Sequence, residues 1–210
     1  HLSGTSYSGT GVFKSSDAGE TWTNMGLHES AHVGTVAIDP VDKNIVYVAA
    51  MGRRGGGGER GIYKTTDGGK TFEQIGEVIV RIHDTRGLVM HLDHHEIWID
   101  PQNADRVLLG NDGGLYESND RGQTWLHMNN IPAAEFYSIS LDMEYPYNVF
   151  GGTQDNAALY GPSDADVADH TDDPWENVYL DRWTGGDSFD TLRDPTNPNI
   201  VYYEHQHGAM

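Results

Sequence analysis

Apolar and polar residues alternate along most of the chain in short stretches, which are separated by Gly, Asp, Asn and Pro. Alternation over about four to eight residues is typical of β-strands with one buried face, and the separating residues are typical of tight turns. One pattern occurs three times: a short apolar strand, then Ser/Thr-x-Asp-x-Gly-x-Thr and an aromatic residue. The copies lie at residues 12–22, 61–72 and 115–125. The pattern predicts a β-hairpin at each copy.

The three aspartates of this pattern, Asp17, Asp67 and Asp120, stand where a tight turn needs acceptors for its backbone N–H groups. The glycine two residues later supplies the positive φ that such a turn requires. We therefore interpret the pattern as a structural turn, and its spacing does not match a calcium-binding loop. The aromatic residues begin the return strands and are expected to be mostly buried: Trp22, Phe72 and Trp125.

A second pattern is interleaved with the first: a strand, Asp-Pro, a polar turn and a β-branched strand. It occurs at residues 36–48, 97–109 and 192–203, with a looser copy at 139–150. Each repeat therefore predicts four antiparallel strands, which we call A and B around Asp-Pro, and C and D around the aspartate turn. Four strands in about 50 residues are typical of one blade of a β-propeller.

The sequence thus predicts an all-β fold, a β-propeller of four-stranded antiparallel blades, with residues 1–210 as a single propeller segment. The expected parts are complete blades at 33–75, 95–128 and 136–180, and half blades at 8–25 and 189–204. The trailing half blade can close on the leading one as a four-bladed ring, or the chain is an excerpt of a larger propeller. We expect the excerpt, about four blades' worth, because the chain starts and stops within a blade.

The charge of the chain restricts the classes of partner that it can bind, since 32 acidic residues against 13 basic ones give a net charge of −19. Phosphate contacts depend on Lys and Arg, so nucleic acid and anionic membranes are not expected partners. No apolar run is long enough to span a membrane. The chain has no cysteine, which excludes disulfides and thiolate metal sites.

In a propeller, the D-to-A and B-to-C connections emerge on one face around the central channel, and the aspartate turns emerge on the other. The first set of connections holds short polar runs flanked by glycine, and these runs should converge on the channel mouth. We expect catalytic side chains there: Asp93, His95 and Asp187. We expect ligand-binding side chains there as well: Arg53, Arg54, His94, Asn111, Asp112, Gln154, Asp155, Asn156 and His205.

These residue types allow several kinds of chemistry. The run at 91–96 combines histidine with carboxylate, which can bind a divalent metal, act as an acid/base pair, or simply order the entrance. The residues establish no cofactor. A divalent metal needs further ligands from other blades, because the local spacing supplies at most two. Aspartates from successive loops can be the acid and base of glycoside hydrolysis, although aspartate also suits turns. Arg53 and Arg54 can bind a carboxylate or belong to a solvated loop.

The chain resembles the Asp-box, or BNR-repeat, propellers of the sortilin/xyloglucanase superfamily. The resemblance lies in the aspartate turns, the Asp-Pro repeat, the 93–95 run and the segments 111–114 and 152–156. It implies a secreted carbohydrate-active, glycoside hydrolase-like protein, extracellular or periplasmic, whose partners are a polysaccharide and the remaining blades of the parent chain. The alternatives are a non-catalytic, sortilin-like propeller with a protein or peptide ligand, and a structural module of a larger assembly.

Overall fold

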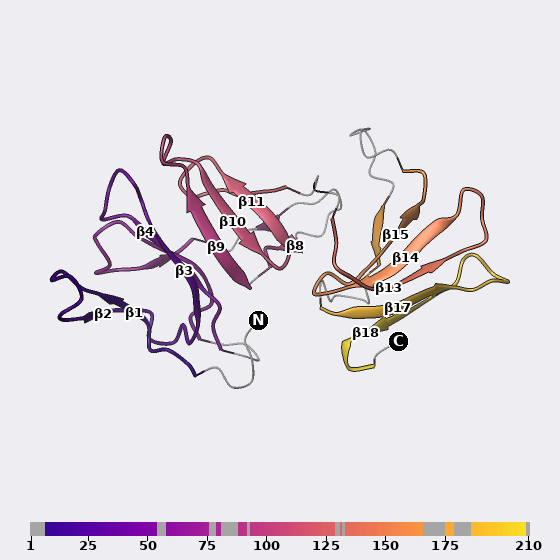
Figure 1. Cartoon of the computed structure of the whole chain (residues 1–210), viewed down its shortest axis with the longest axis horizontal. Coiled ribbons are helices and arrows are strands. Elements are labelled where there is room, and N and C mark those ends of the chain that lie inside the picture. Colours follow the sequence, from indigo (N-terminus) through magenta and orange to yellow (C-terminus); the bar gives the residue numbers. More distant parts are fainter. Residues whose placement is uncertain are drawn as a thin grey trace. The chain divides into compact units, whose positions relative to one another are not determined.

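The structure is a computed structural model that describes residues 7–53, 58–75, 79–80, 88–91, 93–128, 131, 133–165, 175–178 and 186–208. Every strand in this part pairs antiparallel with its neighbours (Figure 1). The predicted all-β class with antiparallel sheets is confirmed. The chain divides into two compact units, residues 1–129 and 130–210, which are described separately.

The described residues of the first unit form two sheets of four strands and two of two strands. One four-stranded sheet contains β3 (Val33–Ile38), β4 (Val46–Ala50), β5 (Gly61–Thr65) and β6 (Glu73–Gln74) in sequence order. The other contains β9 (His94–Ile99), β10 (Val107–Asn111), β11 (Gly114–Ser118) and β12 (Leu126–His127). The pairs are β1 (Val12–Lys14) with β2 (Thr23–Gly26), and β7 (Ile79–Val80) with β8 (Leu88–Val89).

In the part of the second unit that the structure describes, there is one sheet of four strands and one of two. The larger sheet contains β13 (Phe136–Leu141), β14 (Asn148–Thr153), β15 (Ala158–Pro162) and β16 (Glu176–Val178). The smaller contains β17 (Ser188–Arg193) and β18 (Val201–His205), which is followed by a short 3-10 helix, Gln206–Gly208. Among the described residues, no helix is both long and apolar enough to cross a membrane.

The second and third strands of its two four-stranded sheets contribute the most deeply buried part of the core of the first unit. Tyr47, Ile62, Val107 and Leu109 are completely buried there and belong to one continuous cluster. These strands are flanked on both edges, so both of their faces are covered and their sequences read as nearly continuous apolar runs. The phenol of Tyr47 donates to the carbonyl of Arg121 at 3.1 Å, which satisfies its polar end inside the cluster.

Within each unit, the first strand of one sheet closely approaches a strand of the preceding sheet: β9 approaches β3, and β17 approaches β14. A Cβ at Gly34 of β3 would lie 2.5 Å from the carbonyl oxygen of His94, and one at Gly152 of β14 would lie 2.1 Å from that of Phe189. Side chains do not fit at such distances, so glycine is required at both positions. These contacts bring the ends of β9 and β17, where the candidate site residues lie, against the preceding sheet.

Each aspartate turn is a closed hydrogen-bond network between two paired strands. In the first turn, the Ser15 hydroxyl donates to Asp17 Oδ1 at 2.7 Å, and the Thr21 N–H donates to the same oxygen at 2.9 Å. The Thr21 hydroxyl donates to Asp17 Oδ2. The same set of contacts holds Asp67 and Asp120. The interpretation of these aspartates as turn residues agrees with this geometry.

The aromatic residues of the turns differ in burial. Trp125 is 8% exposed and packs in the main cluster, and Phe72 is partly buried against the neighbouring cluster. Trp22 is 62% exposed, so the prediction that it is mostly buried is wrong. Its hairpin is a sheet of only two strands in the described part of the chain, and its indole N–H donates to the carbonyl of Gly19 within the turn. The division of the chain into blades of one ring, closed or continued elsewhere, stays a prediction.

The burial of Trp125 predicts a large loss of stability when its ring is removed. Replacement of Trp125 by alanine should lower the free energy of unfolding by about 3–5 kcal/mol, because it leaves a cavity in the main cluster. Trp22→Ala is the matched control, and it should change the unfolding free energy by less than about 1 kcal/mol, since its ring is exposed. Urea denaturation measures both values. Equal losses in the two variants would contradict the packing role of Trp125.

The turn network predicts an acidic titration of Asp17. Hydrogen bonds from Thr21, and then one from Ser15, lower the pKa of Asp17 to about 2. Because the pKa is lower in the folded chain than in the unfolded chain, this contribution to stability is present above pH ~4 and is lost as the pH falls toward 2. The carbon-13 shift of the Asp17 carboxyl should show this midpoint, and Thr21→Val should raise it. A midpoint near that of an ordinary aspartate in the unaltered chain would contradict the network.

Candidate functional site

The sequence-predicted site residues gather in two clusters, one in each unit. The first, here called the His91 cluster, surrounds the start of β9 and the end of β10 and contains His91, Asp93, His95, Asn111 and Asp112, with Arg60 beside them. The second, here called the Asp187 cluster, surrounds the start of β17 and contains Gln154, Asp155, Asn156, Asp187 and His205, with Tyr137 beside them.

The His91 cluster is positioned by an irregularity in the pairing of β9 with β10. The register shifts between Gly110 and Asn111, so that Asn111 comes to lie opposite His94. The Asn111 side chain then donates to the carbonyl of His91 at 2.8 Å, and its oxygen accepts the N–H of Gly113 at 2.9 Å. Bulges of this kind re-aim side chains at the end of a strand. Here the bulge holds the loop before β9 against the loop after β10.

One ion pair and one histidine–carboxylate contact lie within the His91 cluster. Arg60 contacts Asp93 Oδ1 at 2.6 Å, and Nε2 of His95 is in hydrogen-bond contact with Asp112 Oδ1. All four side chains are partly exposed, with His95 at 44% and Asp112 at 27%. A histidine bonded to a carboxylate can accept or donate a proton near neutral pH. The expected catalytic role of Asp93 and His95 stays a prediction.

His94 occupies a different environment from its neighbours. It is fully buried, and its Nδ1 lies 3.5 Å from the side-chain nitrogen of Asn111. Burial, followed by the positive charges of His91, Arg60 and His95, lowers the pKa of His94 to about 4. The ring is therefore neutral at pH 7 and enclosed by protein. Ligand binding by His94 stays a prediction.

The Asp187 cluster is held together by backbone contacts between two loops. The N–H of Gly186 donates to the carbonyl of Asp155 at 2.9 Å, and the N–H of Ala157 donates back to Gly186 at 3.0 Å. Asp155 has a φ of 58°, and its own N–H donates to Asp187 Oδ1 at 3.2 Å. The left-handed backbone at Asp155 thus turns the 154–156 loop toward the start of β17.

Side chains of several kinds surround these two aspartates. The amide of Gln154 donates to Asp155 Oδ2 at 3.2 Å. Nε2 of His205 lies 3.0 Å from the position that a Cβ would take at Gly186, next to Asp187. Desolvation, followed by the negative charges of Asp187 and Asp155, raises the pKa of Tyr137. Two loops and two strands of this unit therefore bring carboxylate, amide, imidazole and phenol groups together.

An exposed aromatic pair borders the Asp187 cluster. Tyr137 of β13 and Phe189 of β17 are stacked, with their ring centroids 5.1 Å apart and their planes 17° apart. They are 47% and 38% exposed, respectively. The sequence analysis did not select them. Tyr137 could have been found from its outward position in the alternation of its strand, but its partner comes from a strand about 50 residues later, and no local pattern predicts that pairing.

The remaining predicted residues lie elsewhere, and two further functional candidates were missed. Arg53 forms an exposed ion pair with Glu29. Arg54 lies outside the described residues. Arg60 and His91 were not selected as site residues, although His91 begins the histidine-rich run. Arg60 follows the run of four glycines, where its contact with Asp93 of the next sheet leaves no trace in the local sequence.

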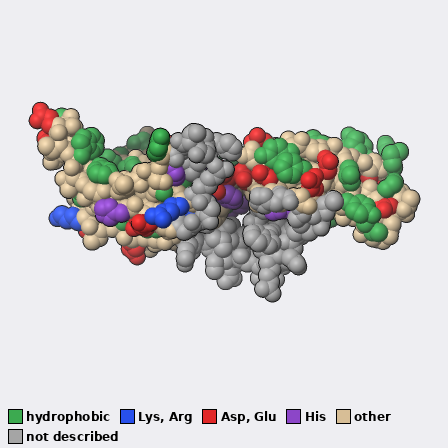
Figure 2. Space-filling model, turned by 90° about the horizontal axis from the view of Figure 1, so that it is seen from below, with side chains coloured by type: hydrophobic (Ala, Val, Ile, Leu, Met, Phe, Trp, Pro, Cys, Tyr) green, Lys and Arg blue, Asp and Glu red, His purple; other side chains and the backbone are tan. Residues whose placement is uncertain are grey.

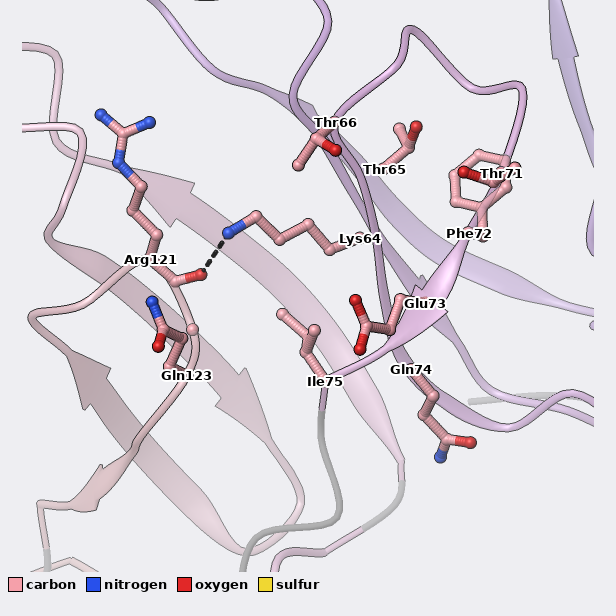
Figure 3. Close-up of a pocket in the computed structure, with 11 residues that line it drawn as sticks. Lys64, Thr65, Thr66, Thr71, Phe72, Glu73, Gln74, Ile75, Arg121 and Gln123 are labelled. Carbon is pink, nitrogen blue, oxygen red and sulfur yellow. Dashed lines mark hydrogen bonds between the residues drawn. The ribbon is translucent and has the colours of Figure 1, made fainter.

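A groove of about 620 Å³ lies between the β5–β6 edge and the third aspartate turn (Figure 3). The side chain of Lys64 reaches across it and donates to the carbonyl of Arg121 at 2.9 Å. Burial is the main cause that lowers the pKa of Lys64. The groove is lined by residues of two aspartate turns and of the strands they join, and none of the predicted site residues lines it. It therefore marks the contact of two neighbouring sheets.

Comparison with known proteins finds relatives among the Asp-box propellers, although no family model matches the chain. A probable oligoxyloglucan-reducing end-specific xyloglucanase of Neosartorya fischeri is 26% identical over 154 residues. That match covers 67% of this chain and 18% of the xyloglucanase, so the chain spans about a fifth of that relative. The sequence match confirms the resemblance to xyloglucanase-type proteins that the repeats indicated.

Solved structures give more distant similarities. The GH74 enzyme of Niastella koreensis is 17% identical, with a TM-score of 0.41, over 91% of this chain and 29% of its own. The structure of YCF48 bound to D1 peptide is 15% identical, with a TM-score of 0.37, over 91% of this chain and 68% of its own.

The burial of His94 predicts an acid-sensitive fold. Its pKa of about 4 lies below the ordinary value of 6.5, so the unfolded chain binds a proton first as the pH falls. Proton binding to the unfolded chain therefore lowers the free energy of unfolding progressively between pH ~6.5 and 4, and it has no effect above pH ~6.5. Imidazole proton NMR should give a midpoint near 4 for His94 in the folded chain and near 6.5 in urea. A folded-state midpoint near 6.5 would contradict the enclosed ring.

Proposed function

We propose that the chain is part of a secreted, carbohydrate-active propeller and that the Asp187 cluster is its glycan site. The observation that carries the proposal is the position of two aspartates beside an exposed, stacked aromatic pair. Sugar rings present apolar C–H faces and polar edges. An aromatic surface beside carboxylate and amide groups matches both, as concave ligand sites combine apolar walls with a few placed polar groups.

The two aspartates suit the chemistry of glycosidic bond cleavage. Asp187 is oriented by the backbone N–H of Asp155, and its carboxylate also bonds with Tyr137. Asp155 is held by the turned backbone and by Gln154. In glycoside hydrolysis one carboxyl protonates the leaving oxygen, and the second activates water or attacks the sugar directly. We assign these two roles to Asp155 and Asp187 as a pair, with Tyr137 and His205 as further titratable groups beside them.

The sequence match to a xyloglucanase supports this class of ligand. Because the chain spans about a fifth of that protein, the activity of the whole protein, the propeller and its remaining blades are parts of the same proposal. An extracellular or periplasmic location fits it, since polysaccharides are found there. A divalent metal at the His91 cluster also stays a proposal.

A second candidate function is protein or peptide binding, and one observation favours it. The second unit exposes apolar side chains along β13, β17 and β18. This unit is drawn on the right of Figure 1, and on the right of Figure 2 hydrophobic side chains lie beside acidic ones. The exposed residues on these strands include Tyr137, Ile139, Leu141, Leu192 and Tyr202. Aromatic residues in an apolar patch are typical anchors of protein interfaces.

A panel of polysaccharides and oligosaccharides, including xyloglucan, tests the proposal on the chain itself. Asp187→Asn and Asp155→Asn should each lower turnover by about 10²–10⁴-fold, which is the usual contribution of a general acid or base. Tyr137→Ala should weaken binding by up to about tenfold, because it removes half of the aromatic pair. Asp164→Asn is the control, since Asp164 is an exposed aspartate after β15, and it should change neither quantity.

Binding is measured by calorimetry and turnover by release of reducing sugar, with thermal unfolding as the check on folding. If no glycan of the panel is bound or cleaved, the carbohydrate proposal is wrong. Capture of peptides from a peptide library, lost in Tyr137→Ala and Leu192→Ser, would then support the second candidate.

A further inference from the structure

We propose that His91, Asp93 and Asp112 bind a single divalent transition-metal ion. Each offers one ligand atom, and these atoms all lie within 4.8 Å of one another. The three residues come from the loop before β9 and the loop after β10, so the site is made by two loops of one sheet. It belongs to the first unit and is independent of the Asp187 cluster and its proposed glycan chemistry.

The ligand types select a class of metal. One imidazole nitrogen and two carboxylate oxygens suit Zn²⁺, Co²⁺ and Mn²⁺. Ca²⁺ and Mg²⁺ take oxygen ligands almost entirely, so a histidine in the set disfavours both. With three protein ligands, water or a polar group of a ligand would complete the coordination, which is the arrangement of open metal sites.

The distances in the cluster are close to those that one ion requires. Ligand atoms about 2.1 Å from the same ion lie at most about 4.2 Å apart. His91 Nδ1 and Asp93 Oδ2 are 3.8 Å apart, which is too long for a hydrogen bond and short enough for a shared ion. The widest pair within the 4.8 Å limit would have to close by at most about 0.6 Å, the difference between 4.8 and 4.2 Å. Rotation of partly exposed side chains is sufficient for that change.

The surrounding contacts hold the ligands in place before an ion arrives. The Asn111 amide fixes the backbone of His91, and the N–H of Asp112 lies 3.4 Å from the carbonyl of Asp93. Arg60 occupies Asp93 Oδ1, and His95 is bonded to Asp112 Oδ1. Partners of this kind orient ligating carboxylates and are typical of the surroundings of metal sites. Each carboxylate is thus oriented through one of its oxygens.

The charge of the cluster also favours a dication. The two carboxylates and Arg60 together carry a net charge of −1 before the histidines are counted. The net charge of −19 for the whole chain adds a field of the same sign. The competing account is that Arg60 and His95 alone neutralise the two carboxylates. The two accounts differ in whether the chain binds a metal.

Titration with Co²⁺ distinguishes them, because binding to mixed nitrogen and oxygen ligands shifts and strengthens the weak visible absorption of the hydrated Co²⁺ ion. The chain is freed of metal with a chelator, titrated with Co²⁺ and then with Zn²⁺. We expect one Co²⁺ per chain, displaced by one Zn²⁺ and not by a tenfold excess of Ca²⁺ or Mg²⁺. Asp93→Asn and Asp112→Asn should each weaken Co²⁺ binding by more than about tenfold.

His28→Gln and Asp164→Asn are the matched controls, since both residues are exposed and lie outside the cluster, and both variants should bind Co²⁺ as the unaltered chain does. Circular dichroism verifies the fold of each variant, and Asp112→Asn alone decides the matter if Asp93→Asn fails to fold. Failure of the unaltered chain to bind millimolar Co²⁺ or Zn²⁺, or equal binding by the aspartate variants and the controls, would overturn the proposal. Glycan binding does not enter any of these measurements.

Discussion

The carboxylate of the turn aspartate is the contact on which the repeated hairpins depend. Asp17, Asp67 and Asp120 each accept a backbone N–H from the threonine four residues later and its hydroxyl, and each is bonded to the serine or threonine two residues earlier. An amide or a hydroxyl at this position has one acceptor oxygen and no negative charge, so it cannot replace the carboxylate in all of these bonds. The network fixes where each pair of outer strands reverses, and hence how the following strands meet.

The proposed glycan and metal sites do not lie at the aspartate turns. They lie in the loops that connect one hairpin or sheet to the next. These loops are held by contacts between distant parts of the chain, such as Asp155 with Gly186 and Arg60 with Asp93. The sheets supply rigid ends, and the loops supply chemistry, which is the usual division of labour in a β-scaffold. Close backbone approach at Gly34 and Gly152 brings the ends of β9 and β17 against the preceding sheets.

The sequence was sufficient for features that depend on a few neighbouring residues. The turns at Asp17, Asp67 and Asp120 follow from local spacing, and so does the antiparallel pairing of their strands. The gathering of Asp155 with Asp187 was expected from repeat geometry. The burial of His94, the exposure of Trp22 and the pairing of Tyr137 with Phe189 were not predictable, because each depends on which strand of another sheet lies beside it.

The short range of the turn network has a consequence for how the chain reaches its fold. All partners of Asp67 lie between Thr65 and Thr71, and the hairpin that they close spans fewer than fifteen residues, from β5 to β6. Small closed loops lose little chain entropy and form quickly. During synthesis, each hairpin can therefore close as soon as it leaves the ribosome, before the strands that will flank it have been made.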